Sequence, residues 1–376
     1  MLLDHVMVDH VVVDAWLRLP DYLSMTSTSS KYSAEVHIDP YKGASKFKST
    51  FYRRSALIAS RRNSPSNNMT TIFNTPGTYP PNTFLPQISA IVTSSDYSSL
   101  AEETAKHLVE AVTTSPNPSS ALWELWTAFF ESVIFSSSPE AHFALLDSIR
   151  AQPPTLPNNL SKTTRDVKEA LRSHTEADGK LHWSELPRFG WEWYDTYATL
   201  HQWRDWTSIQ DADSASGTPN VRSSITCSQR WLRFVNFSTR LLKRSKEQPA
   251  HETIWVFYTC KDVLEHKKPP PRQPDKNRMT AEQLWALDVR VAAIWVRDGA
   301  RALWNTDYGE LRKEWEAALD EPTDLWPRED GLNRERWQLW EERLLALSTD
   351  EASLDEETRG LVKEAYEVVE ELLSNF

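Results

Sequence analysis

One segment of the sequence, His182–Trp206, combines acidic side chains, a second histidine and several aromatic rings at helical spacing. A carboxyl group held among apolar rings can have a raised pKa and act as a general acid. His201 and Asp205 lie four residues apart, on one face of a predicted helix, so they could pair. No nucleophile is recognisable nearby, and the catalytic candidates of the segment are Glu185, Asp195, His201 and Asp205.

The same segment also suits a structural aromatic helix with a solvated acidic face, which is the commoner arrangement of such residues. Trp191 and Trp193 flank Glu192 and cannot share its helix face, so some of these rings should be exposed. Exposed aromatic clusters mark binding surfaces. Two functional hypotheses follow: a docking surface that uses Trp191 and Trp193, or a pocket for a substrate or small ligand lined by residues 183–206.

A second candidate for binding is a proline-rich segment. Lys268, Pro271 and Pro274 fit the Lys-x-x-Pro-x-x-Pro pattern that SH3 domains recognise. Such segments favour an extended conformation, which lowers the entropic cost of docking. Chance matches to this short pattern are frequent, so an exposed linker is the competing interpretation.

The motifs of the common enzyme classes are absent from the sequence. It contains neither the Gly-x-x-x-x-Gly-Lys-Ser/Thr nor the Gly-x-Gly-x-x-Gly phosphate loop, and no Gly-x-Ser-x-Gly nucleophile elbow. The aspartate cluster that a terpene cyclase needs for magnesium diphosphate is also missing. Ten scattered histidines show no ligand spacing, so we predict no metal and no cofactor. These absences favour a non-enzymatic protein.

Charge and hydropathy limit the partners that we expect. The net charge is −11, and an acidic protein is poorly suited to nucleic acid, whose binding depends on neutralising phosphates. No stretch approaches the roughly 18 apolar residues of a membrane span. Two cysteines, Cys227 and Cys260, fit free thiols in a reducing compartment. We therefore expect a cytoplasmic or nuclear protein whose partners are other proteins, with an oligomeric state that the sequence leaves open.

The elements that position these residues are predicted to be helices, because apolar residues recur at helical spacing without sustained alternation. Thr280 and Gln283 predict a capping box before a long helix, about Ala281–Trp304. Its middle, VAAIWV, is apolar nearly all round, which indicates the central helix of the core. Sixteen of the 17 tryptophans lie between Trp123 and Trp340, so we predict an irregular all-α domain with a tryptophan-rich core.

The predicted domain covers residues 98–376, and a capping box of Ser99 and Glu102 marks its first helix. Proline, serine and glycine predict flexible loops inside it, near 151–162, 209–224 and 267–279. Residues 1–97 are predicted to be disordered or misannotated.

The character of the sequence changes abruptly after Asn68. Residues 25–68 are rich in serine, threonine, lysine and arginine without a sustained period, which predicts disorder. One alternative is that translation starts at Met69. Another is that this basic segment binds acidic partners or carries phosphates.

Several landmarks occur in an order that resembles a family of uncharacterised fungal proteins, domain of unknown function 3632. They are LWELWTAFFESV, WSELPRFGWEWYDTY, RWLRFVNFSTRLL, CKDVLEH, AAIWVRDGARALW and RERWQLWEERL, and together they cover roughly residues 100–376. The resemblance implies a fungal, intracellular, all-helical protein and carries over no catalytic residue. Our leading hypothesis is a non-enzymatic interaction or scaffold protein; the alternative is a helical enzyme or small-ligand-binding protein.

Overall fold

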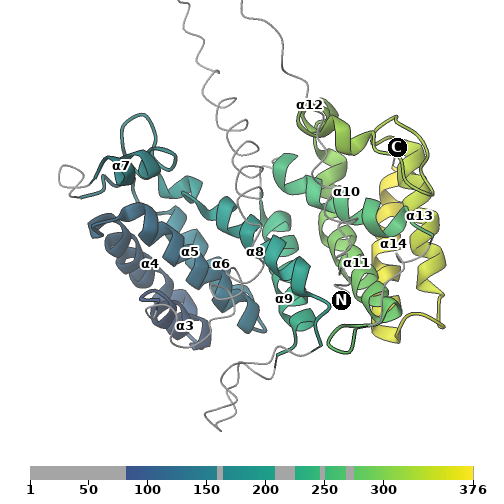
Figure 1. The fold of residues 1–376 in the computed structure, drawn as a ribbon, viewed down its shortest axis with the longest axis horizontal. Helices are drawn as coiled ribbons and strands as arrows, with labels where there is room; N and C mark the ends of the chain where they lie inside the picture. Colours follow the sequence, from purple (N-terminus) through teal and green to yellow (C-terminus); the bar gives the residue numbers. More distant parts are fainter. Residues whose placement is uncertain (1–81, 159–163, 208–224, 246–249, 268–274, 376) are drawn as a thin grey trace, which may run out of the picture. The chain divides into compact units, whose positions relative to one another are not determined.

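The computed structural model describes residues 82–158, 164–207, 225–245, 250–267 and 275–375 (Figure 1). These residues form twelve α-helices and one short 3-10 helix, and no strand is found among them. The prediction of an all-α fold is therefore confirmed. All described residues belong to one compact unit, whose first residue is Met69.

The first half of this unit runs from α3 to α8. Its helices are α3 (Leu85–Thr93), α4 (Tyr97–Thr114), α5 (Pro118–Phe135), α6 (Glu140–Arg150), α7 (Arg165–Arg172), the 3-10 helix η1 (Trp183–Glu185) and α8 (Phe189–Trp203). α5 packs against α3, α4, α8 and α9, and it is buried around most of its circumference, as the paucity of charge in its sequence predicts.

The second half follows from α9 to the end of the chain. Its helices are α9 (Cys227–Arg244), α10 (Ala250–Leu264), α11 (Ala281–Asn305), α12 (Tyr308–Leu319), α13 (Arg334–Ser348) and α14 (Glu356–Ser374). α9 joins the two halves, because it contacts α5 and α8 on one side and α11 on the other.

The central helix is α11, which packs against α9, α10 and α14 (Figure 1). Its capping box forms as predicted, since Thr280 accepts from Gln283 N and the Gln283 side chain accepts from Thr280 N. Trp295 in its middle is only 2% exposed. The tryptophan-rich core is also confirmed, because five tryptophans are among the largest fully buried side chains: Trp126, Trp183, Trp231, Trp295 and Trp340.

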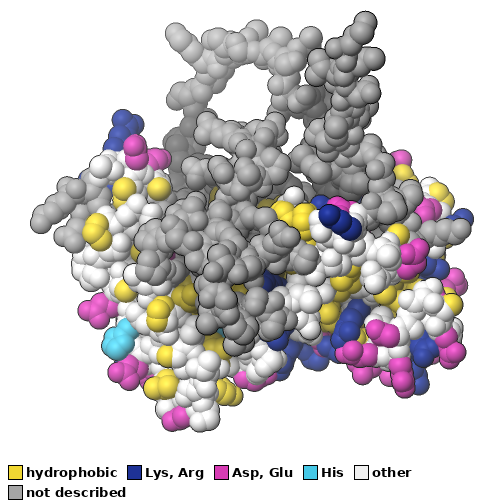
Figure 2. Space-filling model, turned by 60° about the horizontal axis from the view of Figure 1, so that its bottom comes forward, with side chains coloured by type: hydrophobic (Ala, Val, Ile, Leu, Met, Phe, Trp, Pro, Cys, Tyr) yellow, Lys and Arg dark blue, Asp and Glu magenta, His cyan; other side chains and the backbone are white. Residues whose placement is uncertain are grey.

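Arginines of α11 pair with glutamates of α14 along the length of both helices. Arg290 pairs with Glu357, Arg297 with Glu364 and Arg301 with Glu371. Figure 2 shows basic and acidic side chains intermingled on the side of the molecule where these helices lie. The acidic carboxy-terminal sequence is thus partly neutralised by α11.

The helical structure begins earlier than residue 98, the predicted boundary. α3 precedes it, and Phe84, Ile88 and Ile91 are buried in the core. Pro86 lies in the first turn of α3, where the missing amide hydrogen costs nothing, so this proline starts the helix instead of breaking it. The proline- and threonine-rich sequence around α3 is more typical of a loop, so the composition did not indicate this helix.

The capping box of Ser99 and Glu102 is wrong, because α4 begins at Tyr97 and the Ser99 hydroxyl donates to Asp96 instead. In the described part of the predicted loop 151–162, Thr155 forms an isolated β-bridge with Leu181. Residues 1–68 and most of the loops near 209–224 and 267–279 lie outside the described residues.

No helix among the described residues is both long enough and apolar enough to cross a lipid bilayer.

Candidate functional site

A ladder of rings follows one face of α8. Trp193, Tyr197 and His201 lie four residues apart, so their side chains share that face. The rings of Trp193 and Tyr197 stack with centroids 5.3 Å apart, and those of Tyr197 and His201 lie 5.9 Å apart and nearly parallel, at 7°. Trp193 Nε1 donates to Ser238 Oγ at 2.9 Å, which anchors the ladder to α9.

α10 presents a matching face to this ladder. Trp255, Tyr258 and Asp262 lie at positions i, i+3 and i+7 of α10, on one side of the helix. The Trp255 ring lies 4.5 Å from that of Tyr197 and 5.7 Å from that of Tyr258. The rings of the two faces are half-buried and the Asp262 side chain is exposed. We call the six residues the α8–α10 cluster: Trp193, Tyr197, His201, Trp255, Tyr258 and Asp262.

The polar groups of the α8–α10 cluster have perturbed acidities. Although the Asp262 side chain is exposed at the surface, the surrounding protein shields its carboxyl from part of the solvent and raises its pKa to about 7; Lys261 opposes this shift and Asp288 adds to it. Burial lowers the pKa of His201 to about 3, helped by the charge of Arg204. The Tyr197 pKa is raised by burial and by the Asp262 carboxylate, so tyrosine and histidine are both neutral near pH 7.

These groups are also available to a ligand. Within the described part of the chain, no hydrogen bond or ion pair engages the Tyr197 hydroxyl, the His201 ring nitrogens or the Asp262 carboxylate. Polar side chains that are partly buried normally have such partners. Open polar groups with perturbed acidity, gathered beside aromatic rings, are typical of a binding or active site.

An ion pair at the end of α8 supports the α8–α10 cluster. Arg204 Nε donates to Asp288 Oδ1 at 2.7 Å and Nη2 donates to Oδ2 at 3.0 Å. Arg204 Nη1 also donates to the carbonyl oxygen of His201. This contact fixes the last turn of α8 on α11, and with it the position of the His201 ring.

The chemistry of the α8–α10 cluster favours cations. Aromatic faces attract ammonium and guanidinium groups, and a carboxylate adds a charge-assisted hydrogen bond. The described residues include no group of three or more histidine, cysteine, aspartate or glutamate side chains that could hold a metal ion.

The structure separates the predicted catalytic candidates. His201 belongs to the α8–α10 cluster, whereas Asp205 is buried and receives a 3.4 Å hydrogen bond from Arg278 Nη1. The suggested pair of His201 and Asp205 does not form, because Arg278 takes the carboxylate. Glu185 is exposed on η1, and Asp195 is half-buried outside the ring ladder.

The predicted binding residues are also dispersed. Trp193 is part of the α8–α10 cluster, and Trp191 is half-buried two residues before it. Lys268, Pro271 and Pro274 lie outside the described residues. Neither of the two described cavities is lined by a residue of 183–206, so the hypothesis of a pocket there stays a prediction.

Another carboxyl with a perturbed pKa lies at the start of α8. Glu192 is 4% exposed, and its burial raises its pKa to about 7 although Arg188 contacts it at 2.9 Å. Leu186 and Arg188 both have positive φ angles, 47° and 71°, in the turn before α8. Trp126 Nε1 donates to the Pro187 carbonyl and holds this turn in place.

Four residues of the α8–α10 cluster were not predicted from the sequence: Tyr197, Trp255, Tyr258 and Asp262. The spacing of Trp255, Tyr258 and Asp262 was visible as a helical stripe that ends in a carboxylate. Nothing in the sequence indicates that this stripe meets Tyr197, because the contact depends on how α8 and α10 pack.

Comparison with known proteins identifies a family. A family model described as "Protein of unknown function (DUF3632)" matches residues 123–344, more than half of the chain. The matched region includes all of α8, α10 and α11 and hence the whole α8–α10 cluster. Neither the curated proteins nor the solved structures give a significant match. The chain therefore belongs to the DUF3632 family of proteins of unknown function.

Proposed function

We propose that this protein is a non-enzymatic interaction protein that binds an arginine side chain of a partner polypeptide at the α8–α10 cluster. One observation carries the proposal: the exposed Asp262 carboxylate has no hydrogen-bond or ion-pair partner among the described residues and lies beside half-buried rings of two helices. An arginine side chain could donate hydrogen bonds to the Asp262 carboxylate and stack on one of the neighbouring rings.

Arginine fits better than lysine for a physical reason. Its planar guanidinium stacks on an aromatic face and donates two parallel hydrogen bonds to one carboxylate. A cation–π contact contributes about 0.5–2 kcal/mol, depending on how far water is excluded. His201 is neutral near pH 7 and does not repel the cation, and the net charge of −11 attracts basic segments over a longer range.

An intracellular location, in the cytoplasm or nucleus, is part of the proposal. Cys227 and Cys260 are both buried, and neither forms a disulfide in the described part of the chain. Free thiols are typical of proteins in reducing compartments.

A fluorescence polarisation assay tests the proposal with a defined probe. The probe is a labelled peptide pool with one fixed arginine among randomised uncharged residues, compared with the same pool carrying citrulline, which has the same shape without the charge. We expect the arginine pool to bind and Asp262→Asn to weaken it about tenfold. Glu185→Gln, which removes an exposed carboxylate of η1, is the matched control and should leave binding unchanged.

Equal binding of the citrulline pool would contradict the proposal, and so would an equal loss in Asp262→Asn and Glu185→Gln. Tyr197→Phe separates the ring from its hydroxyl. Because stacking on the ring is the expected role of Tyr197, this variant should retain affinity.

The second candidate function is an enzyme or small-ligand-binding protein that uses the same residues. A carboxyl with a pKa of about 7 close to the Tyr197 side chain suits proton transfer. Native mass spectrometry of the chain purified from its own cells distinguishes the two. A small molecule that is lost in Asp262→Asn supports this second function, and a stoichiometric polypeptide lost in that variant supports the first.

A further inference from the structure

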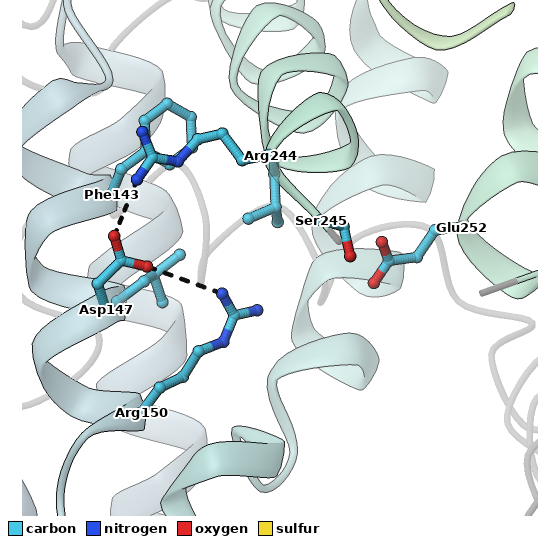
Figure 3. Close-up of a pocket in the computed structure, with 8 residues that line it drawn as sticks. Phe143, Asp147, Arg150, Arg244, Ser245 and Glu252 are labelled. Atoms are coloured by element: carbon cyan, nitrogen blue, oxygen red, sulfur yellow. Dashed lines mark hydrogen bonds and ion pairs between the residues drawn. The ribbon is translucent and has the colours of Figure 1, made fainter. Parts of the chain in front are cut away.

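A separate cavity of about 290 Å³ lies between α6 and the ends of α9 and α10 (Figure 3). Arg150 and Asp147 of α6 face Arg244 and Ser245 across it, and Glu252 points in from α10. A second hollow of about 520 Å³ also has Arg244 in its wall. The two hollows share this one arginine.

Cations outnumber carboxylates among the side chains that line the two hollows. Their walls carry five cations, Arg150, Arg240, Lys243, Arg244 and Arg297, against three carboxylates, Asp147, Glu252 and Asp298. Two of the cations also pair with carboxylates beyond the walls, Arg240 with Glu140 and Arg297 with Glu364. The whole chain has a net charge of −11. Attraction of an anion to this place is therefore local and does not come from the overall charge.

Two guanidinium groups are held in place at the centre. Arg244 lies over the buried Phe143 ring at 4.9 Å, and its Nη2 donates to Asp147 Oδ2 at 2.8 Å. Arg150 Nη1 lies 3.9 Å from the other oxygen of Asp147. A guanidinium has five N–H donors, so one carboxylate between two of them leaves donors for a ligand.

A ligand could replace these ion pairs at a small cost in free energy. Arg244 and Asp147 are 49% and 55% exposed, and exposed pairs contribute at most about 1 kcal/mol. The cations also offset the negative ends of α6 and α9, where Arg150 and Arg244 lie in the last turns. If the arginines only stabilise the helix ends, removing the Asp147 carboxylate should not improve phosphate binding. If they bind a phosphorylated ligand, removing it should strengthen that binding.

We infer that the two hollows form a binding site for a small soluble molecule that carries two or more phosphate groups, one in each hollow, with Arg244 shared between them. Arg240, Lys243 and Arg244 share one face of α9, with neighbouring side chains about 6 Å apart, so phosphates at that spacing can each meet two cations. The cavity volumes suit a small molecule. This site is independent of the α8–α10 cluster.

Isothermal titration calorimetry of the full chain with inositol hexakisphosphate tests the inference, because this probe offers phosphates at several spacings. We expect binding that Arg244→Gln weakens about tenfold, whereas orthophosphate binds at least about tenfold more weakly than the probe. Arg172→Gln is the matched control, since Arg172 is a 76% exposed arginine of α7. It removes the same charge and should leave the affinity unchanged.

Asp147→Asn gives the sharper result. If the guanidinium groups hold phosphate, removing the carboxylate between them should tighten binding several-fold, which misfolding could not produce. Arg150→Gln tests the site without disturbing the contact on Phe143 and should also weaken binding. Equal losses in Arg172→Gln and Arg244→Gln, unchanged or weaker binding in Asp147→Asn, or binding only to vesicles that contain phosphoinositide would each overturn the inference.

Discussion

Glu265, directly after α10, and Arg336 of α13 form an ion pair that is fully closed to water. Arg336 Nε and Nη2 donate to the two carboxylate oxygens at 2.7 and 2.9 Å, and both side chains are 0% exposed. Trp340 Nε1 and Thr323 Oγ1 donate to the same carboxylate at 2.9 and 3.1 Å. Arg336 Nη1 donates to the Gly331 carbonyl. The pair thus joins α10, α13 and the segment before α13.

Arg336→Met should lower the free energy of unfolding by about 3–5 kcal/mol, because it leaves the Glu265 carboxylate buried without its cation. Urea unfolding followed by circular dichroism measures this. Adding Glu265→Gln to Arg336→Met should recover part of the loss, since no buried charge is then left. The control is Arg172→Met at an exposed pair, which should cost no more than about 1 kcal/mol. An equally small loss in Arg336→Met would contradict the prediction.

Trp295→Ala should destabilise the fold by about 3–5 kcal/mol, because it empties a large buried volume in the middle of α11. Trp285→Ala on the same helix is the matched control, and it should cost less because Trp285 is only half-buried. Thermal unfolding compares the two variants with the wild type. A melting temperature of Trp295→Ala that equals the wild-type value would show that this position is not part of the core.

His142 should lower the free energy of unfolding as the pH decreases from about 6.5 to 4. Its side chain is 0% exposed, its Nε2 lies 2.8 Å from Ser132 Oγ, and burial lowers its pKa from 6.5 to about 4. Between these values the unfolded chain takes up a proton that the folded chain does not, so its contribution to stability is complete above pH 6.5 and decreases toward pH 4. The difference corresponds to about 3 kcal/mol.

His142→Gln removes this titration and keeps a hydrogen-bonding side chain near Ser132. Urea unfolding at a series of pH values from about 4 to 7 should show that the difference between variant and wild type shrinks or reverses in acid. A difference that does not change with pH would mean that His142 has an ordinary pKa.

Glu192 should have the opposite effect, lowering the free energy of unfolding as the pH rises. Its folded pKa of about 7 lies above the ordinary 4.5, so the contribution of its protonated form is present below pH 4.5 and is lost as the pH rises to 7. Glu192→Gln stays neutral and should be more stable than the wild type near pH 8, by at most about 3 kcal/mol. Since Arg188 loses a partner, the gain should be smaller than this limit. A loss near pH 8 that exceeds the loss near pH 4.5 would show that the ion pair outweighs burial.

The features that sequence reasoning predicted are those with a local cause. The capping box of Thr280 and the apolar middle of α11 lie within one helix, so they could be recognised without knowledge of its neighbours. The α8–α10 cluster depends instead on the packing of two helices, and only His201 and Trp193 of it were predicted. Asp205 was a candidate because of its spacing from His201, but Arg278, which is distant in the sequence, decides its partner.

The acidity of Asp262 gives the proposed function a distinctive pH dependence. An arginine side chain needs the ionised carboxylate, and the pKa of Asp262 in the free protein is about 7. Peptide affinity should therefore be highest above pH 7 and fall as the pH decreases through 7, approaching about tenfold per pH unit in acid. Since the pKa of His201 is about 3, this histidine adds no charge in the range of the assay.

Fluorescence polarisation with the arginine peptide pool at pH values from about 5.5 to 8.5 measures this dependence. Asp262→Asn should bind weakly with little change across the range, because the titrating group is gone. Glu185→Gln keeps Asp262 and should reproduce the wild-type profile. Affinity that rises on acidification would point to a different ligand group, one that accepts a hydrogen bond from protonated Asp262, and would favour the small-ligand function over the docking of arginine.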